Sequence, residues 1–438
     1  MRPRNSIGTL LLVLALSACA STSLARLEHE RQATPGSFAV NRSLGIAYFR
    51  AGRYTDARAA LETASRLEPR DGTTALYLGL TAEELGDLPA ARTAYASYLD
   101  VGRTSRVRLQ LQSRLAALAK RELAADAKAA VQRENAVGGI VGAPTTVAVM
   151  PLRFTGADSS LRPLERGIAE LLTTDLARSS KLTVVERSRI QALLDELARQ
   201  HSGQTDAATT VRTGKLLRAG RVVQGSILQL GGSQLRLDAA IVDVPTTQIS
   251  GTAQGADQLE RLFDLEKRIA LDLFRELGVT LTIAERNAVE QRPTRSLTAF
   301  LAYSRGLASE DQGRYDEAGR FYRDAIRLDP GFGAAMQKRQ EARAVIRGTD
   351  VSTKSLEAGL RGTSEGAAAG TRGGGADAAV SAREAAGDLN PSAAGAATSP
   401  GGGGEQGPPQ RDPVSAATNT DAVGRAGRVT IVITRPKI

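Results

Sequence analysis

The chain has no tryptophan, only one cysteine and only two histidines among its 438 residues. A single thiol excludes an internal disulfide, even in an oxidising compartment. His29 and His201 stand far apart in polar segments, so we expect surface histidines and no metal site. A Gly-x-Ser-x-Gly motif and a phosphate-binding glycine loop are also missing. We therefore predict that the protein is not an enzyme and that it uses no cofactor and no metal.

Paired carboxylates are the remaining route to acid–base chemistry. The candidates are Asp175, Glu186 and Asp195. Each stands on a predicted helix or at a strand end, where a solvated or capping charge is ordinary. We assign them no catalytic role.

Aromatic residues are scarce at 4%, whereas glycine and alanine are abundant. This composition favours helices packed through alanine and leucine, together with some unstructured sequence, and the length suffices for two or three domains. The net charge is +10, but the arginines are dispersed among acids and lack interleaved aromatics. Nucleic acid is therefore not an expected partner. A solvated arginine-rich surface is the simpler reading, and a weak attraction to anionic lipid or cell-wall polymer stays open.

The amino terminus has the layout of an export signal. Arg2 and Arg4 precede an apolar run over residues 7–18, which is too short to span a membrane. The run ends in Leu16-Ser17-Ala18-Cys19, which resembles a bacterial lipobox. The resemblance implies removal of signal peptide 1–18 and lipidation of Cys19, with the membrane bound through this lipid anchor. Since no aspartate follows the cysteine, it also implies an outer-membrane protein that faces the periplasm. An ordinary cleaved signal with an unrelated cysteine is the alternative.

Two segments, 38–71 and 72–105, align at a period of 34 residues. Matching glycines, alanines and tyrosines in them resemble tetratricopeptide repeats, and a further helix is predicted from Ser105 to about Asn135. A third unit at 299–332 contains GRYDEAGRFYRDAIRLDP. We assign 38–135 and 299–345 to helical repeat domains. The third unit could stand alone, cap the central domain or stack on the first pair.

Repeat arrays of this kind bind protein segments along their concave face. Carried over by repeat position, the partner-binding residues of this chain would be Arg42, Phe49, Arg50, Thr73, Leu76 and Glu83. The alternative is that Phe49 and Leu76 belong to the core and that the charges are merely solvated.

The central segment 146–285 has the pattern of an α/β domain. Strands are predicted at 145–151, 182–186, 221–230, 234–244 and 246–254, and helices at 164–179, 187–199, 211–217 and 257–277. This order implies a mixed sheet with helices on at least one face. Segments 147–154, 164–190, 214–227 and 236–249 resemble the CsgG family of curli assembly and transport components. The fold class is therefore α/β plus all-α, a CsgG-like mixed-sheet domain flanked by tetratricopeptide repeats.

That resemblance also implies outer-membrane association and possible homo-oligomeric rings. In the curli channel, long hairpins of each subunit cross the membrane. Here the strand links at Gly231–Ser233 and at 243–248 are short, so we expect a globular relative of the channel.

The carboxyl-terminal part is rich in glycine, alanine, serine and proline. We predict a disordered linker over 349–427 and a terminal strand over 428–435, the sequence RVTIVITR, that adds to the protein's own sheet or to a partner's. The combined reading is a lipid-anchored outer-membrane scaffold or accessory protein for export or envelope assembly, with envelope or secretion proteins as partners. The alternatives are a subunit of a curli-type oligomeric secretion pore and a lipoprotein regulator of a cell-wall synthase.

Overall fold

The computed structural model describes residues 23–134, 142–200, 207–361 and 363. All of them belong to the first of two compact units, Met1–Gly374. The predicted signal peptide, Cys19, His201 and the terminal strand 428–435 lie outside the described residues, as does most of the predicted linker. His29 is exposed, as predicted.

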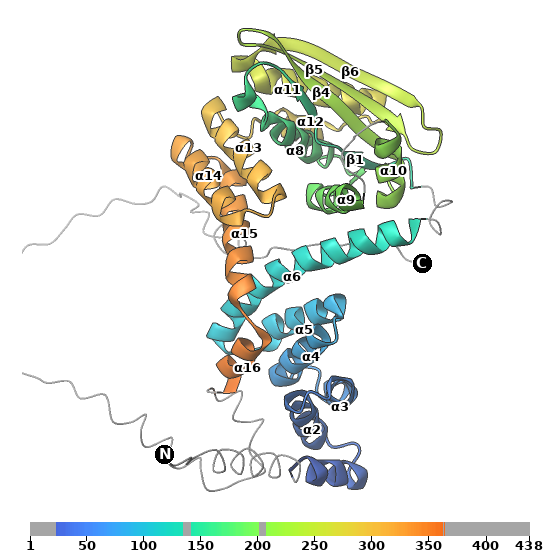
Figure 1. Cartoon of the computed structure of the whole chain (residues 1–438), viewed down its shortest axis with the longest axis vertical. Helices are drawn as coiled ribbons and strands as arrows, with labels where there is room; N and C mark the ends of the chain where they lie inside the picture. Colours follow the sequence, from blue (N-terminus) through green and yellow to red (C-terminus); the bar gives the residue numbers. More distant parts are fainter. Residues whose placement is uncertain (1–22, 135–141, 201–206, 362, 364–438) are drawn as a thin grey trace, which may run out of the picture. The chain divides into compact units, whose positions relative to one another are not determined.

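Two helical hairpins follow a helix over residues 23–33. They consist of α2 (Phe38–Arg50), α3 (Tyr54–Leu67), α4 (Gly72–Glu84) and α5 (Leu88–Val101), and the long helix α6 (Ser105–Gln132) comes next (Figure 1). Capping residues fix where the helices begin, because Ser37 and Asp71 each accept a hydrogen bond from the backbone N–H three residues later. The predicted repeats are confirmed.

Glycine makes the helical hairpins possible. Gly52 and Gly86 occupy the turns between paired helices with φ of +74° and +76°, a region that favours glycine. A Cβ built on Gly79 would lie 2.3 Å from the ring of Tyr95, and one built on Gly306 would lie 2.4 Å from the ring of Tyr322. The same close approach of two helices therefore recurs in the distant third unit.

The central domain is built on a six-stranded mixed sheet of order β3-β1-β4-β5-β6, with β2 paired to β4. The strands are β1 (Thr146–Val149), β2 (Arg153–Thr155), β3 (Thr183–Val184), β4 (Arg221–Gly231), β5 (Gln234–Asp243) and β6 (Ile249–Gln258). Strands β1 to β4 pair in parallel, whereas β4, β5 and β6 form an antiparallel meander. The mixed sheet is confirmed, and the three-residue β2 is an addition that the sequence pattern did not predict.

The sheet is covered unequally. Helices α8 (Leu164–Leu176) and α11 (Leu262–Glu276) pack on one face and share its apolar core. Helices α9 (Arg187–Gln200) and α10 (Ala207–Leu217) lie on the other face over β1 and the start of β4, with Ala127 and Val131 of α6 in the same cluster. Most of the meander on that second face has no helix over it among the described residues (Figure 1).

The third repeat packs against the central domain. After α12 (Ile283–Glu290), it consists of α13 (Leu297–Asp311), α14 (Tyr315–Leu328) and α15 (Gly333–Asp350). Phe300 of α13 meets Phe263 of α11 edge to face with ring centroids 5.3 Å apart, and a Cβ built on Gly167 of α8 would lie 2.0 Å from Ser304 Oγ. The unit therefore caps the central domain, and its last helix, α15, also packs against α6 of the amino-terminal helical region.

The helical region extends further along the chain than predicted. The linker was expected from residue 349, but α15 runs to Asp350 and a further helix, α16, covers Thr353–Arg361. Leu356 and Leu360, one helical turn apart, are fully buried in the core of the amino-terminal repeats. In the part of the chain described here, no helix combines the length and apolarity needed to cross a membrane.

Candidate interaction surfaces

The first candidate surface is the inner face of the amino-terminal repeats, formed by α2, α4 and α6. Helix α16 lies against it. Leu356 and Leu360 supply its apolar contacts, and Thr353 donates from Oγ1 to Glu84 Oε1 of α4 at 2.7 Å. A Cβ built on Gly359 would lie 3.2 Å from Gln110 Oε1 of α6, so the two helices are close. The face that was predicted to receive a partner is thus covered by a segment of the same chain.

A polar contact fixes α16 at its middle. Glu357 accepts hydrogen bonds from Arg50 Nε at 2.8 Å and from the Tyr77 hydroxyl at 2.9 Å, while Arg50 Nη2 donates to the same hydroxyl at 3.0 Å. Burial acts to raise the pKa of Glu357, but hydrogen bonds from Arg50 and Arg361 outweigh it and the pKa is lowered. Burial raises the pKa of Tyr77 to about 12. At neutral pH a carboxylate is therefore held by two guanidinium groups, those of Arg50 and of Arg361 on α16 itself, and by one neutral phenol.

Four of the predicted partner-binding residues hold other parts of the repeats. Arg42 pairs with Asp71 at 3.1 Å, and Phe49, Thr73 and Leu76 are buried. Phe49 meets the ring of Tyr77 edge to face. These four contribute to the packing of α2 against α4.

Glu83 and Arg50 bind helices that come later in the chain. Glu83 is buried between Arg114 and Arg121 of α6, and it accepts a hydrogen bond from the Tyr95 hydroxyl at 3.1 Å. Arg114 also donates to the carbonyl of Gly348 in α15 at 3.3 Å. Their role toward an external partner stays a prediction.

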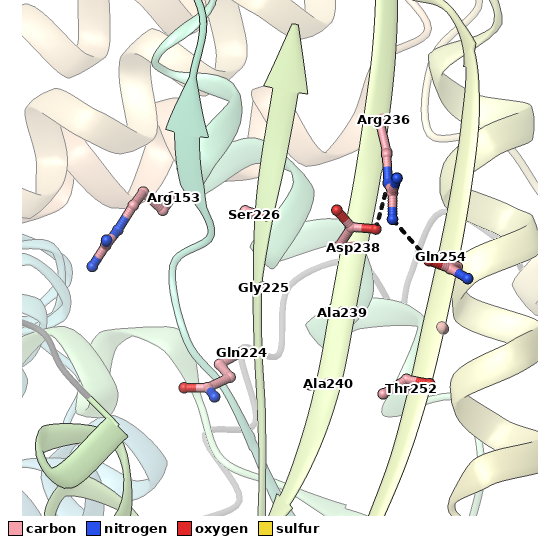
Figure 2. A pocket seen from close by; sticks show the side chains of 11 residues that line it. Arg153, Gln224, Gly225, Ser226, Arg236, Asp238, Ala239, Ala240, Thr252 and Gln254 are labelled. Carbon is pink, nitrogen blue, oxygen red and sulfur yellow. Dashed lines mark hydrogen bonds and ion pairs between the residues drawn. The ribbon is translucent and has the colours of Figure 1, made fainter. Parts of the chain in front are cut away.

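The second candidate surface is the uncovered face of the meander, which Figure 2 shows from close by. Short side chains, Ser226, Ala240 and Thr252, line a hollow of about 540 Å³ together with longer polar ones. Arg236 donates to Asp238 at 2.8 Å and to Gln254 at 2.9 Å, which ties β5 to β6 (Figure 2). The lining residues are Arg153, Gln224, Gly225, Ser226, Arg236, Asp238, Ala239, Ala240, Thr252, Ala253 and Gln254. This open, polar surface suits contact with another macromolecule.

A buried ion-pair cluster joins the third repeat to the central domain. Arg187 of α9 pairs with Glu170 of α8 at 2.9 Å. It also pairs with two acids of α13, Glu310 at 3.5 Å and Asp311. Lys338 of α15 pairs with Glu310 at 3.3 Å. No local sequence pattern indicated this cluster, because its members come from four separate helices.

The pKa values of two of the three acids in the cluster, Glu310 and Asp311, move in opposite directions. Burial would raise the pKa of Glu310, but Lys338, Lys120 and Arg187 lower it to about 2. Burial raises the pKa of Asp311, and Arg187 only partly opposes that rise. The cluster therefore depends on its cations to keep two buried carboxylates charged.

Asp175 differs from its prediction as a solvated or capping charge. It is 4% exposed, and Lys267 of α11 donates to it. Glu266, next to Lys267, is fully buried, and burial followed by the nearby Asp175 raises its pKa well above the ordinary value. The group lies between α8 and α11 and does not line the hollow of the meander. We assign it a structural role.

The described residues contain no group of three or more histidine, cysteine, aspartate or glutamate side chains placed to hold a metal ion.

Family profiles match three parts of the chain. The profile of the curli production assembly/transport component CsgG matches residues 121–247. Two tetratricopeptide repeat profiles match residues 42–105 and 299–332. The chain carries tetratricopeptide repeats and a CsgG-family domain. The CsgG match begins within α6, so this helix belongs to both regions.

No curated protein gives a significant sequence match. Among solved structures, the chain is similar to the LpoB C-terminal domain from Salmonella enterica, with 21% identity over 30% of this chain and 94% of that one and a TM-score of 0.22. It is also similar to a tetratricopeptide repeat protein from Parabacteroides merdae, with 12% identity over 76% of this chain and 95% of that one and a TM-score of 0.22.

Proposed function

We propose that this protein is a lipid-anchored scaffold or accessory protein of the outer membrane, facing the periplasm and serving export or envelope assembly. The observation that carries the proposal is the union in one chain of tetratricopeptide repeats with a CsgG-family domain, and the layout of residues 1–18 as an export signal before Cys19 supports it. Repeats supply surfaces for protein segments, and the domain belongs to a family described by curli assembly and transport.

The open face of the meander supports a role in assembly. Its floor of small side chains and its rim of arginine and glutamine present hydrogen-bonding groups over a surface that no helix in the described ranges covers. Polar surfaces of this kind occur at non-obligate protein interfaces. We expect envelope or secretion proteins as partners, and a second copy of the chain as one possible occupant of this face.

The lipid anchor is tested by labelling cells with a radioactive fatty acid. The wild-type protein should be labelled and should sediment with the outer membrane, whereas Cys19→Ser should lose both properties. A double variant, Cys19→Ser with Ser21→Cys, restores the thiol two residues later, outside the lipobox, and should stay unlabelled. A wild-type chain that remains unlabelled, or that keeps residues 1–18 in the cytosol, would contradict the proposal.

Partners are tested by crosslinking in intact cells. A photoreactive residue in place of Gln254 samples the open sheet face, and one in place of Arg275 samples the helical side of the same domain as the control. Specific products at Gln254 would support the scaffold. Recovery of a cell-wall synthase there would favour the regulator alternative, and reproducible conductance of the purified lipoprotein in bilayers would favour the pore alternative. The absence of any product at Gln254 would remove this face from the proposal.

A further inference from the structure

Helix α16 is seated on the repeats as a bound peptide would be. It has nine residues, and the two residues 351–352 separate it from α15. A helix of this length is not stable alone in water, so its conformation depends on the surface that it contacts. Three helices, α2, α4 and α6, form that surface. Arg50 of α2 and Tyr77 of α4 bind Glu357, and α6 contacts α16 near Gln110.

The two carboxyl-terminal helices are attached in different ways. Helix α15 crosses α6 at Gly348, where an added Cβ would lie 2.0 Å from the Ser113 carbonyl oxygen, so the backbones are in direct contact. Helix α16 is held by two leucines, by Glu357 and by the hydrogen bond from Thr353 to Glu84, and the Arg50 side chain that binds Glu357 is 46% exposed. Removal of α16 would leave the contact between α15 and α6 in place.

We propose that the inner face of α2, α4 and α6 is a helix-binding groove, and that α16 is a built-in occupant which a partner segment displaces. The chemistry of α16 defines the partner. It is an amphipathic helix with two leucines four residues apart, a carboxylate directly after the first and a small residue directly before the second, as in Leu356-Glu357-Ala358-Gly359-Leu360. The leucines fill the apolar groove, the carboxylate binds Arg50 and Tyr77, and the small residue permits the close approach to α6.

This inference rests on the proposed function only in that the repeats serve protein partners. It adds the identity of the groove, the pattern that the groove accepts and a mechanism that keeps the groove closed until a partner competes. While α16 occupies the groove in most molecules, a partner binds with a weaker apparent affinity. This affinity is the intrinsic one reduced by the fraction of molecules in which the groove is open.

The test uses the full chain and a fluorescent peptide of residues 351–363. The double variant Leu356→Asp/Leu360→Asp should release α16 and bind the peptide at least tenfold more tightly than the wild type. Adding Arg50→Ala to the double variant should weaken peptide binding at least tenfold, and a scrambled peptide should not bind.

Hydrogen exchange supplies a second readout on the unaltered protein. Amides of α16 should exchange faster than those of α4 and α15, and saturating peptide should leave the exchange of α4 unchanged. Equal affinity of the wild type and the double variant for the peptide would overturn the proposal. So would loss of the helices α2 to α6 in the double variant, because α16 would then be an integral part of the array. A wild-type dimer that exchanges α16 would assign the groove to a second copy instead of a partner. None of these outcomes depends on lipidation, so failure here is separable from failure of the proposed function.

Discussion

Replacing Arg187 with methionine tests whether the third repeat and the central domain are a single folding unit. The methionine keeps much of the volume of the arginine stem but removes the charge that three carboxylates share. Arg187 is 8% exposed, and its partners Glu170, Glu310 and Asp311 come from α8 and α13. The substitution therefore acts where the two regions meet.

Removal of one partner from a buried ion pair costs about 3–5 kcal/mol, because the charge left behind has lost its compensation. Glu310 still pairs with Lys338 and Lys120 in the variant, so its negative charge stays largely compensated. Asp311 keeps only Arg166 at 3.5 Å. Asp311 should therefore carry most of the cost, and we expect the variant to lose about 3 kcal/mol at pH 7, the lower end of that range.

The sign of the pH dependence follows from Asp311. Burial already raises its pKa above 3.8, and loss of Arg187 should raise it further. A carboxyl group whose folded pKa exceeds its unfolded pKa destabilises the folded state as pH rises through that window. The deficit of the variant should therefore be largest near neutral pH and should shrink toward pH 4.

The assay is urea unfolding followed by circular dichroism, with hydrogen exchange of α8 and α13 to assign the transition. Arg199→Met is the matched control, since Arg199 lies on the same helix, is 62% exposed and pairs only with Glu196 three residues earlier. Glu196 is buried, but the Arg199 guanidinium is largely in solvent, and an ion pair within one helix at the surface contributes about 1 kcal/mol or less. If Arg187→Met costs no more than Arg199→Met, or if α13 unfolds before α8, the cluster does not join the two regions and the reasoning is wrong.

Two further predictions concern single buried positions. Glu266→Gln, beside Asp175, should stabilise the protein relative to the wild type. The difference in unfolding free energy should grow with pH by up to about 1.4 kcal/mol per pH unit, because the raised pKa of Glu266 makes its ionisation in the folded state costly above pH 4.5. A difference that stays constant across pH in urea unfolding would contradict this. Gly348→Ala should destabilise the contact with Ser113 of α6 by about 1–3 kcal/mol, whereas Gly319→Ala, at a helical position with open space around it, should stabilise by about 0.5–1 kcal/mol. Thermal melts of both glycine variants decide the second prediction, and equal shifts would refute it.

Local pattern was enough to predict the repeats and the meander. In the repeats, Gly52 and Gly79 stand at fixed offsets because a turn and a helix crossing each require a glycine, and such requirements recur every 34 residues. In the meander, alternating apolar residues of β5 point to the core while Arg236 and Asp238 point away from it. Both features depend on neighbours that are near in sequence, so they are visible without a structure.

The candidate surfaces were less predictable because they depend on contacts between distant parts of the chain. Arg50 was predicted from its repeat position, but its partner Glu357 lies 307 residues further along the chain. A signal for α16 was present in the spacing of Leu356 and Leu360, and the surrounding glycine and alanine obscured it. Asp175 gave no signal of burial, since the lysine that binds it lies on another helix.

The arrangement of the last helices gives the carboxyl-terminal segment more weight than its sequence suggests. Residues 297–361 contribute Phe300 and Tyr322 to the core of the central domain and Leu356 and Leu360 to the core of the first repeats. A single stretch of chain therefore completes two hydrophobic cores that lie on either side of α6 in sequence. Helix α15 contacts α6 through backbone atoms, and the proposed displacement of α16 would leave that contact in place. The repeats would then change their occupant while the central domain keeps its structure.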